Sequence, residues 1–253
     1  MSFLMRRGIA SSGGLGGGII FSANSALLNG SSQYYQSPIN TSAAFTVSAV
    51  VNLDGATGDI YTIFSEHHTT TTSLKRFSLR YQVDITTLFF DTFAGGTLVR
   101  DAMVMAVSGW NLFSITYTSG TAELYQNGTL ISTLSVAMNA PSTQPLFFGR
   151  FNAVTAQLLD GSMSMLSLYT RNLSAAECLE LANLDTGVPV LKCHDDLSAG
   201  LKSNLIGFWN LGNTAGAQLP VGDELVDQSG NLNTMGATGS PTYTDQGLTV
   251  ECS

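Results

Sequence analysis

Short runs of alternating apolar and polar residues dominate the chain. The clearest covers residues 45–51, where a period of two puts Phe45, Val47, Ala49 and Val51 on one face of a half-buried strand. Similar runs predict strands over 19–21, 31–35, 60–64, 77–81, 88–90, 113–117, 122–125, 145–149 and 163–169. Short strands separated by turns are typical of an antiparallel all-β fold.

Two consecutive hairpins are predicted in the middle of the chain. The strands 113–117 and 122–125 are joined by a short polar turn at 118–121. Asn127-Gly128 follows directly, and this dipeptide tolerates the positive φ angles of a type I′ turn.

One short helix is predicted near residue 175. Ser174 can cap its first turn and Glu177 can complete a capping box, while Gly187 and Pro189 end it. Its apolar contacts are expected from Leu179, Leu181, Ala182 and Leu184.

The composition of the chain excludes several classes of protein. The hydrophobic share is 44% and only 11% of the residues are charged, which is the opposite of a disordered chain. The net charge of −8 disfavours nonspecific nucleic-acid binding, and no apolar run approaches the length of a membrane-spanning helix. So little charge predicts a surface covered by partner subunits or by glycans, hence a homo-oligomer or another assembly.

The three cysteines match no zinc or redox spacing. Cys178, Cys193 and Cys252 are an odd number, and their separations are long for a disulfide framework. We therefore expect free thiols in a reducing compartment.

Several segments resemble a known family. Residues 110–115, 122–128 and 146–150 look like successive core strands of a laminin G-like, concanavalin A-like jelly roll. Residues 159–163 and 168–177 are similar to the closing signature of that family, a strand entry and an exit followed by an acidic capped helix. The resemblance covers about 19–185 and implies two antiparallel sheets packed face to face, with one short helix at an edge.

The chain divides into three parts on this basis. Residues 1–18 form a glycine-rich N-terminal arm, and residues 19–190 form the jelly-roll domain. Residues 191–253 contain a segment that resembles the beginning of another such domain. They are too few to form a second sandwich. They are either a degenerate repeat or a C-terminal extension, and we favour an extended arm.

No catalytic residues are predicted. Glycoside hydrolases on this fold need two carboxylates that face one another, and no strand carries acids at alternating positions. The acids of the first half are isolated at turns or strand ends and are expected to be solvated: Asp54, Asp59, Glu66, Asp84 and Asp91. A hydrolase would require a pair assembled by the fold.

Three short motifs have structural explanations. The run 193–196 (Cys-His-Asp-Asp) has the residue types of a catalytic triad, but neighbours along a chain point apart. The run 66–68 (Glu-His-His) lacks metal-ligand spacing and is expected to be a polar loop. The run 127–129 matches a glycosylation sequon but coincides with the predicted hairpin turn.

Two kinds of ligand site stay open. The resemblance implies an edge calcium site, for which Asp54, Asp59 and Asp160 are the candidates. The aromatic candidates for sugar stacking are Tyr34, Tyr35 and Phe93, although periodicity does not separate core from surface here.

A basic start, a glycine-rich arm and a laminin G-like sandwich without a signal peptide resemble structural proteins of tailed bacteriophages. We therefore expect a non-enzymatic virion protein that decorates or reinforces the particle, with major capsid or tail proteins as partners. The alternative is a lectin-like module, on a virion or extracellular, that recognises a cell-surface glycan.

Overall fold

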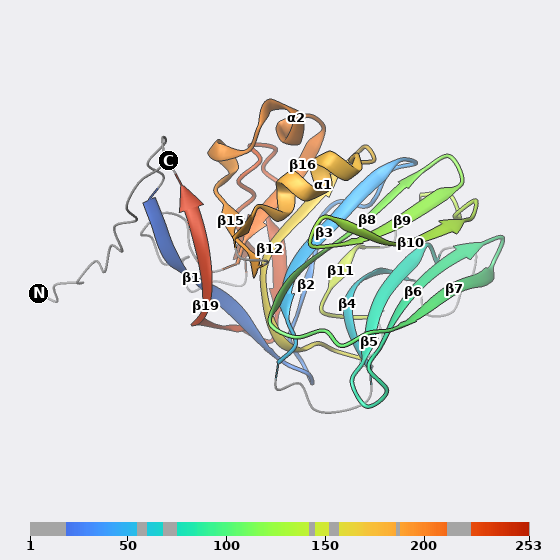
Figure 1. Cartoon of the computed structure of the whole chain (residues 1–253), viewed down its shortest axis with the longest axis horizontal. Helices are drawn as coiled ribbons and strands as arrows, with labels where there is room; N and C mark the ends of the chain where they lie inside the picture. Colours follow the sequence, from blue (N-terminus) through green and yellow to red (C-terminus); the bar gives the residue numbers. More distant parts are fainter. Residues whose placement is uncertain are drawn as a thin grey trace, which may run out of the picture.

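The structure is a computed structural model that describes residues 19–54, 60–67, 75–141, 145–151, 157–185, 188–211 and 224–252. Two β-sheets stack across a shared core, which confirms the predicted all-β jelly-roll sandwich (Figure 1). The expected arm 1–18 lies outside the described residues.

Sheet A has nine described strands. Their order is β10 (Thr129–Ser135), β9 (Thr121–Gln126), β8 (Trp110–Thr118), β3 (Phe45–Asn52), β12 (Asp160–Tyr169), β1 (Ile19–Asn29), β19 (Thr242–Cys252) and β15 (Leu191–Lys192), with β16 (Leu205–Asn210) also paired to β12. The strand pairs are antiparallel except for β15 with β19, which is parallel.

Sheet B has eight described strands and is antiparallel. Their order is β17 (Glu224–Leu225), β18 (Met235–Thr238), β2 (Tyr34–Gln36), β11 (Phe147–Phe148), β4 (Ile60–Glu66), β5 (Phe77–Gln82), β6 (Thr87–Ala94) and β7 (Thr97–Val104). Two short strands, β13 (Leu184–Asp185) and β14 (Val188–Pro189), pair separately. The helices are α1 (Ala175–Ala182), α2 (Ala199–Lys202) and a 3₁₀ turn at His194–Asp196.

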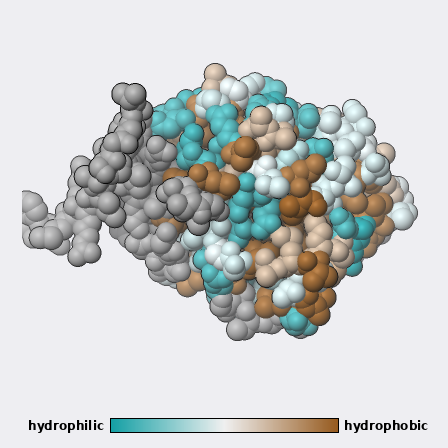
Figure 2. Space-filling model, in the orientation of Figure 1, coloured by the Kyte–Doolittle hydropathy of each residue, from teal (hydrophilic) through white to brown (hydrophobic). Residues whose placement is uncertain are grey.

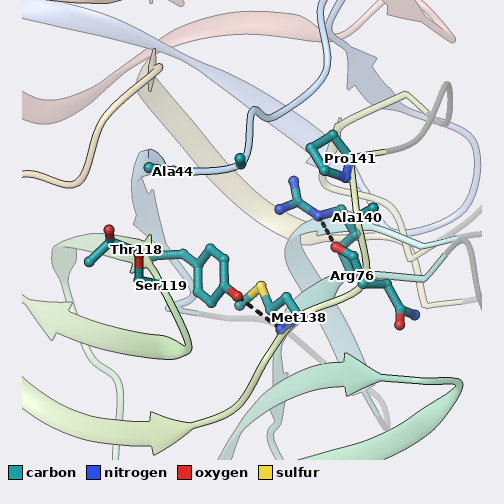
Figure 3. A pocket seen from close by; sticks show the side chains of 10 residues that line it. Ala44, Arg76, Thr118, Ser119, Met138, Ala140 and Pro141 are labelled. Atoms are coloured by element: carbon teal, nitrogen blue, oxygen red, sulfur yellow. Dashed lines mark hydrogen bonds between the residues drawn. The ribbon is translucent and has the colours of Figure 1, made fainter.

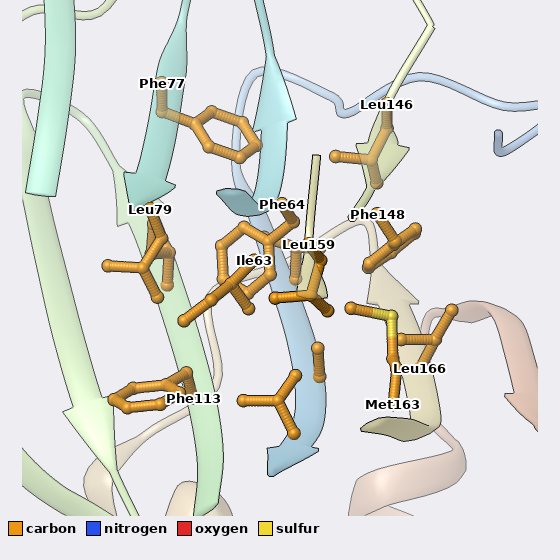
Figure 4. Packing of buried hydrophobic residues seen from close by; sticks show 14 of the residues in the cluster. Ile63, Phe64, Phe77, Leu79, Phe113, Leu146, Phe148, Leu159, Met163 and Leu166 are labelled. Carbon is orange, nitrogen blue, oxygen red and sulfur yellow. The ribbon is translucent and has the colours of Figure 1, made fainter. Parts of the chain in front are cut away.

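The core fills the space between the inner faces of the two sheets (Figure 4). Phe64 and Phe148 of sheet B meet Met163 of sheet A there, and all three side chains are fully buried. Phe45 stacks on Phe77 across the sheets with 4.9 Å between ring centroids. Alternation along each strand supplies these apolar faces, and their burial stabilises the sandwich.

The outer face of sheet A is also buried, so the expectation of a half-buried strand at 45–51 is wrong. Val50 points away from the main core and joins Leu112 and Met165 in a second apolar cluster. Cys178 of α1 and Leu201 of α2 cover this cluster. The residues that cover this face are distant from β3 in sequence. The alternating pattern of β3 therefore does not predict that the face is covered.

The capping box of α1 forms as predicted. The Ser174 side chain accepts from the Glu177 amide, and the Glu177 carboxylate accepts from the Ser174 amide. The predicted contacts of Leu179 and Leu184 are wrong, because these side chains are 53% and 40% exposed. Positions one helical turn apart face the sheet together, so Cys178 takes the inner place beside Leu181 and Ala182.

An ion pair ties α1 to the segment that links it to β12 and makes stability depend on pH. Both Arg171 terminal nitrogens donate to Glu177, and together with Ser174 they lower the pKa of Glu177 to about 2. A carboxyl group whose pKa is lowered on folding stabilises the fold at pH values above its pKa in the unfolded chain. This stabilisation is lost as the pH falls through the pKa of the folded state.

Glu177→Gln is expected to lower the free energy of unfolding by about 2 kcal/mol above pH 5, since the pair is about a quarter exposed and partly screened. The difference from the native protein should shrink toward pH 2. Urea unfolding followed by circular dichroism at several pH values measures it, with Glu180→Gln as the control on the same helix. A difference that does not change with pH would contradict the ion-pair explanation.

The two central hairpins are confirmed. β8 pairs β9 around the turn at 119–120, and β9 pairs β10 around Asn127 and Gly128, whose φ angles are 51° and 75°. The strand β7 was missed by the sequence analysis. It pairs with β6 in a hairpin at the edge of sheet B, and none of its side chains is buried. It therefore lacks the alternation of apolar residues that predicts the other strands.

Residues from the C-terminal part pair with both sheets. β16 lies on β12, β18 lies on β2, and β19 runs along β1 until Cys252 pairs with Ile19 (Figure 1). Among the described residues, no helix reaches the length and apolar character that crossing a membrane requires.

Some large apolar side chains stay on the surface. The most exposed are Leu232 at 84% and Val104 at 81%. Figure 2 shows apolar residues interspersed with hydrophilic ones on the visible face. Single exposed apolar residues are normal in soluble domains. The homo-oligomer therefore stays a prediction.

Candidate functional site

The outer face of sheet B carries a shallow groove between β2 and β18. Tyr35 points into the core, so the alternation of β2 turns Tyr34 and Gln36 outward. Thr238 pairs with Tyr34, and Gly236 pairs with Gln36, which places all four residues on the same outer face. The groove holds about 310 Å³ and is lined by Gln36, Ser37, Pro38, Gly236, Ala237 and Thr238.

Gly236 keeps this groove open. Of the atoms that the structure describes, a Cβ built at Gly236 would meet only the Gln36 carbonyl oxygen, at 3.9 Å. The missing side chain therefore leaves space beside the exposed side chains of Gln36 and Thr238. These two carry hydrogen-bonding groups that can act as donors or acceptors.

An aromatic pair with a stacked guanidinium lies beside the groove. Phe147 pairs with Gln36 across the strands, and its ring meets Tyr34 edge-on at 5.8 Å. The Arg150 guanidinium lies 4.2 Å from the Tyr34 ring centroid and 5.3 Å from that of Phe147. Cation–π contact with both rings fixes the position of Tyr34, which is half-buried.

Further along the same face, Asp91 holds two arginines. Arg100 donates to both Asp91 oxygens, and Arg80 donates to Oδ2 of Asp91. The hydrogen bond to Asp91 raises the pKa of Arg100. Both guanidiniums also flank the ring of Phe89, at 5.7 Å for Arg80 and 4.8 Å for Arg100. These ion pairs connect β5, β6 and β7 on the outer face of sheet B.

The groove has the chemistry of a site for a polar ring. A half-exposed aromatic ring accepts the apolar C–H face of a flat or puckered ring, while hydroxyl and amide side chains bond its polar edge. Tyr34 supplies the first element, whereas Phe147 is only 4% exposed and supports the Tyr34 ring. Gln36 and Thr238 supply the second.

The three aromatic candidates from the sequence fall in different places. Tyr34 borders the groove. Tyr35 is a core residue whose pKa is raised, mainly by burial and then by Tyr243, with which it shares a hydrogen bond. Phe93 is 7% exposed and packs against His67, so its face is occupied.

Two of the five acids are not solvated, which corrects the expectation for them. Glu66 is fully buried beside Arg76 and Thr41, and Asp91 is 1% exposed among its arginines. Each is buried because guanidinium and hydroxyl donors compensate its charge. Asp54 and Asp84 are exposed at turns as expected, and Asp59 lies outside the described residues.

The calcium candidates are brought together only in part. Asp54 and Asp160 lie at the same end of the paired strands β3 and β12, where Asn52 is opposite Ser162. Both Asp54 oxygens accept from the Gly109 amide at 3.0 Å. Among the described residues, no three His, Cys, Asp or Glu side chains converge. Two carboxylates are few for an ion that takes six to eight oxygens, so calcium binding stays a prediction.

The cysteines correct the expectation of free thiols. Cys193 is disulfide-bonded. The parallel pairing of Lys192 with Glu251 brings the backbone of residues 193 and 252 to the same end of β15 and β19. Cys178 is a buried free thiol whose pKa is raised to about 12, mainly by burial.

The motifs at 193–196 and 127–129 keep their structural explanations, but the expectation of a polar loop at 66–68 is wrong: Glu66 ends the strand β4, and Glu66 and His67 are both buried. Cys193 is not a nucleophile, because its sulfur is bonded. The Glu66 carboxylate accepts a hydrogen bond from the Thr41 amide and forms an ion pair with Arg76. Residue 68 lies outside the described residues. The Asn127 side chain bonds the Leu112 amide and the Asn111 side chain across the hairpin.

Sequence reasoning missed most of the groove. The groove and its surroundings are built from three segments that are distant in sequence and contain Gln36, Thr238 and Arg150. Only the pairing of β2 with β18 and β11 brings these segments together. The one available signal was the alternation at 34–36, which offered Tyr34 as a candidate.

The family follows from a comparison with family models. The model described as the concanavalin A-like lectin/glucanases superfamily (Laminin_G_3) matches residues 29–178. The chain belongs to this superfamily. This agrees with the two stacked sheets and with the capped helix that follows β12.

Several solved structures are similar to this superfamily member at low identity. A "putative carbohydrate binding protein" from Bacteroides ovatus ATCC 8483 is similar with a TM-score of 0.63 and 16% identity, over 90% of this chain and 61% of that chain. A heptameric SAP-like pentraxin from Limulus polyphemus has a TM-score of 0.48 and 14% identity, over 64% of this chain and 80% of that chain. The CBM40 of Ruminococcus gnavus IT-sialidase has a TM-score of 0.47 and 17% identity, over 56% and 83%. No curated protein sequence matches the chain.

Proposed function

We propose that this protein is a non-catalytic carbohydrate-binding module whose site is the groove between β2 and β18. The observation that carries the proposal is the open groove at Gly236 beside the partly exposed Tyr34 ring, which the buried Phe147 supports edge-on. The Tyr34 ring stacks on the apolar face of a sugar, and Gln36 and Thr238 bond its hydroxyls.

Two further findings support a carbohydrate ligand. The chain belongs to a superfamily named for lectins and glucanases, and the Bacteroides ovatus protein of the same fold is named for carbohydrate binding. Because a fold hosts many functions, the groove itself bears the argument. The buried carboxylates Glu66 and Asp91 are each committed to arginines, which supports a binding role over a catalytic one.

The proposal includes an extracellular location. Disulfides persist in oxidising environments, and Cys193 is disulfide-bonded. The virion role, with its arms and capsid or tail partners, stays a prediction.

Tyr34→Ala and Gly236→Val are expected to weaken glycan binding at least tenfold. The first removes the stacking ring. The second fills the groove without backbone strain, since among the described atoms only the Gln36 carbonyl oxygen lies within 4 Å of the new Cβ. An array of neutral and acidic oligosaccharides identifies the ligand, and isothermal titration of the best hit measures the loss.

Phe89→Ala is the matched control. It removes a half-buried ring that contacts arginines on the same sheet face, but outside the groove. It should bind within about twofold of the native protein. Failure of the native protein to bind any glycan, or native affinity in both groove variants, would contradict the proposal.

A further inference from the structure

A second pocket opens at the edge of the sandwich, about 390 Å³ in volume (Figure 3). It lies between the segment before β3, the end of β8 and the segment that follows β10. Its apolar walls are Ala44, Tyr117, Met138 and Pro141. This edge pocket shares no lining residue with the groove.

Arg76 forms the polar part of the edge pocket although its side chain is only 1% exposed. Its Nε donates to the Asn139 carbonyl at 3.0 Å, and its Nη1 donates to Thr41 Oγ1. No described residue accepts a hydrogen bond from Nη2. Figure 3 shows the terminal nitrogens of the guanidinium turned toward Ala44, across the pocket.

The guanidinium is also held by an aromatic ring and by the buried carboxylate of Glu66. Its plane lies 4.9 Å from the Phe45 ring centroid, and Glu66 Oε2 is 3.7 Å from Nη1. Glu66 Oε2 also accepts from the Thr41 amide and hydroxyl, so it serves three donors. Burial lowers the pKa of Arg76 more than Glu66 raises it.

We propose that the edge pocket binds a small ligand that presents a carboxylate to Arg76 and an apolar body to Tyr117, Met138 and Pro141. A carboxylate would accept a charge-assisted hydrogen bond from Nη2, the guanidinium nitrogen that has no acceptor among the described residues. A volume of this size and a mainly apolar lining with a few polar residues, here Arg76, Thr118, Ser119 and Asn139, are typical of small-molecule sites. The inference is independent of sugar binding at the groove.

Titration of the full chain with phenylacetate and with its neutral analogue phenylacetamide tests the carboxylate requirement. Phenylacetate is expected to bind at least tenfold more tightly, and its addition should shift the amide resonances of residues around Tyr117 and Asn139. Equal affinity for the two probes, or no binding of phenylacetate, would overturn the proposal.

Ala44→Trp tests the location. It fills the pocket while leaving Arg76 and Glu66 intact, and it should reduce phenylacetate affinity at least tenfold. Ala102→Trp, an equally large change at an exposed position on β7, and Gly236→Val in the groove should leave phenylacetate affinity unchanged. Native affinity in Ala44→Trp would place the probe elsewhere and overturn the assignment.

Discussion

Replacing Trp209 with alanine is expected to lower the free energy of unfolding by about 4 kcal/mol. Trp209 is fully buried in the main core, and its indole Nε1 donates to the Asn233 carbonyl at 2.9 Å. Its ring lies over Gly207, where a Cβ would come within 2.0 Å of it. The substitution therefore leaves a large cavity and an unpaired carbonyl.

Urea unfolding followed by far-ultraviolet circular dichroism measures this effect without relying on the deleted fluorophore. Leu232→Ala is the control, since Leu232 belongs to the same C-terminal part but is 84% exposed, and it should change stability by less than about 0.5 kcal/mol. A loss below about 1 kcal/mol for Trp209→Ala would mean that β16 does not contribute to the core in solution.

Asp91→Ala is expected to lower the free energy of unfolding by about 3 kcal/mol, because it leaves buried positive charge without a partner. Asp91 accepts from Arg80, Arg100 and the Ser78 hydroxyl, and the Arg80 side chain is only 7% exposed. Removing one member of a buried ion pair costs more than the pair itself contributes.

The same denaturation measurement checks this prediction, with Asp84→Ala as the matched control at an exposed turn. If release of the uncompensated charge causes the loss, Arg80→Met combined with Asp91→Ala should recover part of it. No recovery in the double variant, or equal stability of Asp91→Ala and Asp84→Ala, would contradict the explanation.

Local features of the fold could be read from the chain because their causes are local. The capping box needs only Ser174 and Glu177 three residues apart, and the type I′ turn needs only Asn127 and Gly128 in sequence. Alternation identified β3 because its inner residues must all face the other sheet.

The candidate site could not be read in the same way. Thr238 lines the groove and Tyr34, its partner across the strands, borders it, yet about two hundred residues separate them and nothing in either segment specifies their register. Glu66 and Asp91 looked like surface acids, because the arginines that allow their burial come from other strands.

The sequence by itself therefore determined the all-β class, the superfamily, the hairpins and the capped helix, since each depends on spacing within a few residues. Only the tertiary structure decided that the outer face of sheet A is covered, that Cys193 is disulfide-bonded, and that Tyr34 rather than Tyr35 borders a groove. These outcomes depend on which distant segments pack together, and packing is settled by the summed burial of both sheets rather than by any one stretch of chain.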